Sequence, residues 1–259
     1  MILECIPEYK KAEEWAGLSE KYGLSFEYNE FFNPAVLEDE NLIDEIVGIY
    51  NGLGRDGKND TLHGAFLDIT VSSSDPMIRN ASDYRVSQSL EIASRLNARG
   101  VVFHTNYLTD FKSSVYRQNW VDSNIKYWGR KCHEYGGLNI FLENMFDNTP
   151  ELLAKVAAGL SETENFGVCL DLAHAFLSRT ALKEWIEALS GHVMHIHIND
   201  NDGLEDLHLS VGAGKMDWNI LKEKALFDRD PSVLIEVSGR EKLETSYEFL
   251  KENKFLNLE

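Results

Sequence analysis

Histidine and carboxylate residues recur at one place in the short apolar segments of this chain, namely at or just after their carboxyl ends. Segments such as VVFHT, IFLEN and GVCLDL are rich in β-branched or aromatic residues and end in His, Glu or Asp. Six of eight such segments carry these groups, at His63, at His104, at Glu143, at Asp171 and His174, at His197 with the following Asp206 and His208, and at Glu236. If the folded chain brings these groups together, removing them from water would be costly unless they are paired. A divalent metal ion is the simplest partner that they could share.

The types of these candidate ligands narrow the choice of metal. Imidazole and carboxylate without thiolate suit zinc, manganese, iron or cobalt better than calcium, which prefers an all-oxygen shell. A single His or Glu at a strand end is more often an ordinary hydrogen-bonded residue, but convergence from six segments indicates a metal site. Nine candidates exceed what one ion needs, which permits a cluster with metals about 3.5–4 Å apart. Cys169 and His195 lie one layer deeper, where we expect packing or supporting roles.

Eight strands alternating with helices would have to position these groups. The predicted strands are residues 2–6, 24–29, 61–66, 101–105, 139–144, 167–172, 193–198 and 233–238. Helical patterns follow the strands, for example at 9–23, 42–53, 84–100 and 119–137. This alternation predicts an α/β protein with a single (β/α)8 TIM barrel over residues 1–259, in which a helix follows each strand and all strand carboxyl ends meet at one mouth.

An open doubly wound sheet is the competing architecture. It usually has fewer strands and often carries a glycine-rich phosphate loop after the first one. Neither a GxGxxG nor a GxxxxGK[ST] motif follows residues 2–6, and no proline- or serine-rich linker divides the chain. The sequence therefore favours one closed barrel domain.

The composition of the chain limits the kinds of partner that we expect it to bind. The chain has 259 residues, with 25 Lys and Arg against 43 Asp and Glu, and a formal net charge of −18. Duplex binding draws its phosphate contacts from Lys and Arg, and the predicted loops offer few of these, chiefly Arg79, Arg117, Arg179, Lys215 and Arg240. No apolar run reaches the roughly 18 residues that span a bilayer. Three cysteines without CxxC spacing indicate reduced thiols, so we expect a cytoplasmic protein that binds neither nucleic acid nor membrane.

Several segments together resemble a known family. LHGAFLD, VVFHTNY, IFLENMFDNTPE, GVCLDLAHAF, HIHINDNDG, DLHLSVGAGKMDW and VLIEVS are similar to the xylose isomerase-like TIM-barrel superfamily. This superfamily includes sugar phosphate isomerase/epimerases and endonuclease IV-type apurinic endonucleases (AP endonuclease family 2). The resemblance covers about residues 60 to 240, and DLAHAF and DLHLSVGAG are its most specific parts.

The resemblance implies two alternative ligand sets. In the epimerases, one metal is held at positions that fall here on Glu143, Asp171, His197 and Glu236. In endonuclease IV, a trinuclear zinc cluster uses nine ligands, which fall on His63, His104, Glu143, Asp171, His174, His197, Asp206, His208 and Glu236. The nuclease's glycine-rich N-terminal motif and arginine-rich DNA loops are missing here, and Phe66 is a rough counterpart of its substrate-facing aromatic residue.

We expect from this resemblance a metal-dependent isomerase or epimerase that acts through a metal-stabilised enediolate, with zinc or manganese as the cofactor. Glu143 and Glu236 would act as base and acid on a small polyhydroxylated substrate, with or without a phosphate group. The substrate would also contact Glu27, His63, His104 and His174. The alternatives are an endonuclease IV-like zinc phosphodiesterase and, with less support, a metal-binding protein without activity.

Overall fold

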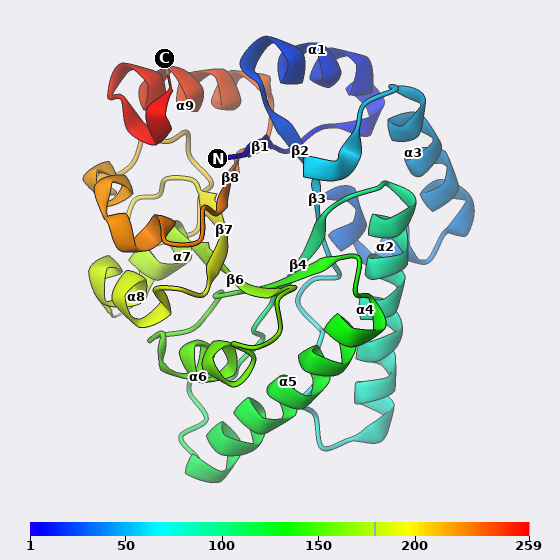
Figure 1. Cartoon of the computed structure of the whole chain (residues 1–259), viewed down its shortest axis with the longest axis vertical. Coiled ribbons are helices and arrows are strands. Elements are labelled where there is room, and N and C mark those ends of the chain that lie inside the picture. Colours follow the sequence, from blue (N-terminus) through cyan, green and yellow to red (C-terminus); the bar gives the residue numbers. More distant parts are fainter. Residues whose placement is uncertain (179, 259) are drawn as a thin grey trace.

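Eight strands pair in parallel with their sequence neighbours and close into a barrel, in the order β1 to β8 (Figure 1). The computed structural model describes residues 1–178 and 180–258, so that Arg179 lies outside the described residues. The strands are β1 (Leu3–Cys5), β2 (Ser25–Tyr28), β3 (Thr61–His63), β4 (Gly100–His104), β5 (Asn139–Glu143), β6 (Phe166–Asp171), β7 (Val193–Ile198) and β8 (Ser232–Ile235). The predicted barrel is confirmed, and every strand begins within one residue of its predicted start.

Helices surround the barrel (Figure 1). They are α1 (Ala12–Tyr22), α2 (Pro34–Leu37), α3 (Glu40–Gly52), α4 (Pro76–Arg95), α5 (Ser114–Glu134), α6 (Glu151–Gly159), α7 (Leu172–Leu177), α8 (Leu182–Leu189) and α9 (Arg240–Glu252). Their starts follow from local chemistry: the Asp39 and Asp75 side chains cap α3 and α4, and Pro76 occupies the first position of α4. Trp120 and Trp128 on α5 are buried against the barrel.

The connection from β7 to β8 differs from the prediction that a helix follows every strand. Within its described residues it contains only two short 3-10 helices, Trp218–Lys222 and Lys224–Phe227. The buried carboxylate of Asp200 explains this, because it accepts hydrogen bonds from Gly212 N, Met216 N and Trp218 Nε1 at 3.1, 3.2 and 2.9 Å. These hydrogen bonds hold residues 200–218 in a compact loop in place of a helix.

The barrel interior below the mouth is partly polar. Glu4, Glu27, Thr61 and His195 are all 0% exposed there. Val102, Phe141 and Cys169 form a small apolar cluster in the same interior. These polar side chains lie directly below the strand ends that carry the predicted ligands.

The three cysteines are free and buried, which agrees with the predicted reduced thiols. Among the described helices, none combines the length and the apolar character that a bilayer span requires.

Candidate metal centre

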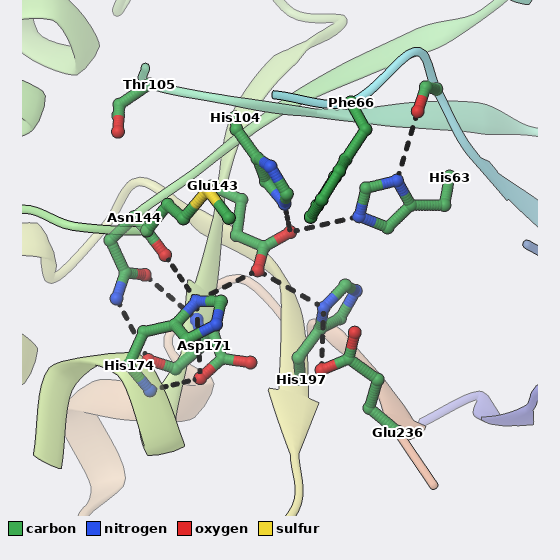
Figure 2. A network of polar contacts seen from close by, with 12 residues as sticks. His63, Phe66, His104, Thr105, Glu143, Asn144, Asp171, His174, His197 and Glu236 are labelled. Carbon is green, nitrogen blue, oxygen red and sulfur yellow. Dashed lines mark hydrogen bonds and ion pairs between the residues drawn. The ribbon is translucent and has the colours of Figure 1, made fainter. Parts of the chain in front are cut away.

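All nine predicted ligands lie at the carboxyl-terminal mouth of the barrel (Figure 2 labels seven of them). Four are the last residues of their strands and one is the penultimate residue of β7, while Glu236 directly follows β8. His174 lies on α7, and Asp206 and His208 lie in the connection after β7. Parallel strands in a barrel end at one level, so these positions bring the side chains together. They form three groups.

The first cluster consists of His63, His104 and Glu143. Glu143 Oε2 lies 3.3 Å from His104 Nε2 and 3.8 Å from His63 Nε2. Ligand atoms of the three residues lie within 4.8 Å of one another, and all three side chains are buried. Ligands bound at about 2.0–2.2 Å from one zinc ion are separated by no more than about 4.4 Å. The separations of 3.3 and 3.8 Å from Glu143 Oε2 to the two imidazole nitrogens meet this limit, so the three residues suit a shared ion.

The second cluster consists of Glu143, Asp171, His197 and Glu236. His197 Nδ1 lies 3.5 Å from both Glu143 Oε1 and Glu236 Oε2. Ligand atoms of Glu143, Asp171 and His197 also lie within 4.8 Å of one another. Glu143 therefore presents one oxygen to each of two clusters, as a bridging carboxylate does (Figure 2).

The third cluster consists of His174, Asp206 and His208. Asp206 Oδ2 lies 3.4 Å from His174 Nε2 and 3.1 Å from His208 Nε2. Asp206 and His208 are partly exposed, unlike the first two clusters. The third cluster therefore forms the solvent side of the site, and His174 Nδ1, 3.4 Å from Glu143 Oε1, joins it to the others.

Backbone carbonyls orient three of the imidazoles. Nδ1 of His63, His174 and His208 lies 3.1, 2.9 and 3.0 Å from a carbonyl oxygen, of Gly64, Asn144 and Glu236 respectively. A carbonyl oxygen can only accept, so each Nδ1 carries the hydrogen. Nε2 is therefore left as the coordinating atom, which is the usual arrangement of metal-binding histidines.

Buried polar atoms without hydrogen bonds concentrate in the first two clusters. They include both carboxylate oxygens of Glu143, Oδ2 of Asp171 and Nδ1 of His197. Such atoms are costly inside a protein unless they bind a partner. Because their separations match those of shared ligands, the residues fit one or more divalent metal ions.

The electrostatics of the mouth also favour a cation. Burial, together with the charges of Glu236 and Glu143, raises the pKa of Asp171 to about 8. Burial alone would lower the pKa of His208, but Glu236 and Asp206 raise it to about 10. Closely spaced carboxylates therefore stabilise positive charge here, which is the field that a bound metal ion requires.

Glu27 lies beneath the ligands. It is 0% exposed, and its Oε1 and Oε2 lie 3.4 and 3.0 Å from Nε2 of His197 and of His195. Contact with a substrate remains a prediction for this residue, whereas in the fold its carboxylate contacts these two imidazoles and accepts a hydrogen bond from Thr61 Oγ1 at 2.8 Å. A carboxylate at Nε2 of His197 holds the hydrogen on that nitrogen, so that Nδ1 faces Glu143 and Glu236.

Replacing Glu27 is expected to weaken zinc binding. Glu27→Gln removes the charge behind His197 at nearly constant volume, and we expect the zinc Kd measured by calorimetry to rise about tenfold or more. The matched control is Glu4→Gln. Glu4 is equally buried but contacts Arg99 and His195 rather than His197. An equal effect of the two variants would show that Glu27 acts only through general stability.

Three further residues, Asn144, Asn199 and Asp200, position the predicted ligands. In the sequence they stand out only as parts of the segments IFLENMFDNTPE and HIHINDNDG. Asn144 pairs through its side-chain amide with the backbone of Asp171, at 2.9 and 3.0 Å. Asn199 Nδ2 donates to Glu236 Oε2 at 3.1 Å. Asp200 anchors the connection that carries the third cluster. Their roles depend on partners distant in the sequence.

A family model covers most of the chain. The family model described as "Xylose isomerase-like TIM barrel" matches residues 29–253, a range that includes all nine predicted ligands. The uncharacterised protein MJ1311 of Methanocaldococcus jannaschii is 27% identical over 203 residues, which cover 74% of this chain and 68% of that protein.

Solved structures share the whole barrel. The TTHB071 protein of Thermus thermophilus, soaked with ZnCl2, is 25% identical, with a TM-score of 0.76 and 97% of each chain covered. A D-tagatose 3-epimerase-like protein is 21% identical, with a TM-score of 0.74, covering 97% of this chain and 96% of its own. Endonuclease IV of the same Thermus species is 17% identical, with a TM-score of 0.62, covering 97% and 98%. The last two establish the common fold.

Proposed function

The chain belongs to the xylose isomerase-like TIM barrel family, and from this premise we propose that it is a metal-dependent phosphodiesterase acting on a small polyhydroxylated substrate. One observation carries the proposal. The nine ligand-type side chains lie in three adjoining clusters, with one oxygen of Glu143 in each of two clusters and the Asp206 carboxylate between two imidazoles. A single-metal isomerase needs four of these residues, whereas polynuclear phosphoester hydrolysis uses all nine.

The metals would be zinc or manganese held by the nine residues. Bound divalent ions supply Lewis acidity to phosphoryl oxygens and a nucleophile at neutral pH. The protein orients the ligands: Asn199 fixes the Glu236 carboxylate, and Asn144 fixes the backbone at Asp171. The Phe66 ring packs beside the first cluster, with its centroid 4.9 Å from that of His104 (Figure 2).

The surface charge supports a small substrate rather than duplex DNA. With a net charge of −18, the chain would repel a polyanion outside a local cationic face. Of the loop cations considered, Arg117 and Arg240 pair with Glu151 and Glu244. Both arginines are thus already neutralised.

The isomerase or epimerase expected from the resemblance is the second candidate. It is favoured by the two glutamates at the second cluster, each with an oxygen 3.5 Å from the same nitrogen of His197. Two carboxylates around one point could exchange a proton on either side of a substrate carbon. Both proposed reactions would act on a small polyhydroxylated substrate and would use the second cluster.

Asp206→Asn separates the two readings. We expect it to lower zinc-dependent hydrolysis of bis(4-nitrophenyl) phosphate at least about 100-fold, because it removes the ligand between His174 and His208. Asp202→Asn, in the same connection but bonded only to Leu204 N and Glu205 N, is the control. If the protein instead exchanges deuterium into D-tagatose with manganese and Asp206→Asn leaves that exchange unchanged, the isomerase reading replaces this one.

A further inference from the structure

A groove beside the metal centre gathers exposed apolar side chains. Half of the large apolar side chains that are exposed in the described chain line this one cavity of about 810 Å³. We define the apolar groove by six of them, Leu67, Ile78, Leu108, Phe111, Val115 and Phe146. Apolar side chains gathered in a cavity of this size are typical of pockets that bind small molecules.

The apolar groove continues outward from the ligands. Leu67, Asn106 and Phe146 line it and lie four, two and three residues beyond the ends of β3, β4 and β5. Asn106 has a φ of +45°, and its amide donates to Ile69 O at 3.1 Å, which joins two of the loops. Asparagine adopts this left-handed conformation more readily than most residues, and the hydrogen bond to Ile69 O fixes it here.

The lining combines apolar and aromatic side chains with Ser, Thr and Asn, and it is nearly uncharged. Among the described residues that line the groove, Asp68 is the only charged side chain and none is Lys or Arg. The rings of Tyr107 and Tyr116 stack with centroids 5.5 Å apart, and Phe111 meets Tyr116 edge-on at 5.2 Å. Such a surface would not hold a phosphate, and it suits an aromatic ring with a few hydroxyl contacts.

We propose that the apolar groove binds an aromatic substituent of the substrate whose phosphate group lies at the metal centre. The inference rests on the proposed function and narrows its substrate class to phosphate esters with an aromatic part. The volume is in the range of small-molecule pockets, about 300–1,000 Å³, and the cavity is concave. None of the nine predicted ligands lines the groove, but Leu67, Asn106 and Phe146 follow three ligand-bearing strands, so a substituent attached to the reacting phosphate would extend toward it.

The test compares benzylphosphonate with methylphosphonate, which lack a hydrolysable ester bond. By calorimetry on the zinc-loaded protein, we expect benzylphosphonate to bind about tenfold tighter or more, since apolar burial is favourable in proportion to area. Phe111→Ala and Val115→Ala should bring the two affinities within about threefold. Both side chains are more than half exposed, so folding should be retained. Tyr84→Ala, an exposed aromatic side chain outside the groove, should keep the preference.

A phosphate-free probe separates this inference from the proposed function. We expect 2-naphthol to give a saturation-transfer NMR signal with the wild-type protein, and Phe111→Ala to reduce it strongly. If neither phosphonate binds but 2-naphthol does, the groove stands and the proposed function fails. Equal affinities of the two phosphonates, or no 2-naphthol signal, would overturn the groove. So would light scattering that shows a wild-type dimer dissociated by Phe111→Ala.

Discussion

Glu143→Gln is expected to lower kcat/KM at least about 1,000-fold and to reduce the bound zinc by one ion or more per chain. Glu143 lies within 3.3 to 3.8 Å of four histidines, and both of its oxygens are buried without hydrogen bonds. An amide carries no charge and cannot bridge two ions, so this substitution damages the first and second clusters together. Because the isomerase reading also requires Glu143, the loss is expected for either reaction. Metal content by elemental analysis and steady-state kinetics measure the two effects.

The control for this substitution is Glu30→Gln. Glu30 is a partly buried carboxylate that accepts hydrogen bonds from Tyr9 N and Tyr50 Oη rather than facing one of the nine predicted ligands. It should leave zinc content and activity unchanged. Glu143→Gln has almost the volume of the original side chain, so circular dichroism should show a folded protein. Retention of both zinc and activity by this variant would refute the assignment of the metal centre.

Adding zinc to chelator-treated protein is expected to raise the midpoint of thermal unfolding by about 8 °C or more. A ligand present at 1,000 times its Kd stabilises the folded state by about 4.1 kcal/mol, and each kcal/mol shifts Tm by about 2–4 °C in a chain of this size. The physical source is the neutralisation of Glu143, Asp171 and Glu236. Burial, together with the charges of the two glutamates, raises the pKa of Asp171 to about 8. Differential scanning calorimetry measures the shift.

The number of zinc ions bound per chain, measured by elemental analysis of the same zinc-loaded protein, is a second expected result. We expect more than one zinc per chain, with up to three if every cluster is filled. Calcium at equal concentration should shift Tm much less, because imidazole nitrogens are poor ligands for it. No shift with either zinc or manganese would contradict the metal centre, and a single tightly bound ion would favour the isomerase reading.

The barrel and the level of the ligands within it could be predicted from the amino-acid sequence. Each strand is a short β-branched or aromatic run, so its pattern is local, and a residue such as His104 or Asp171 must lie at the mouth once its strand joins a parallel barrel. The positions of these residues at the strand ends confirm the prediction. The prediction of a helix after β7 was wrong, because Asp200 organises the β7–β8 connection through hydrogen bonds to residues up to 18 positions away.

The grouping of the ligands, in contrast, emerges only when the chain is folded. Spacing along the chain does not indicate that Glu143 presents one oxygen to His104 and the other to His197, since this depends on rotamers set by three different strands. Nor does it indicate that Glu27 lies beneath His197, because the strand carrying Glu27 meets β7 only across the barrel interior. Contacts between distant strands arise when the sheet closes, and no local pattern encodes them.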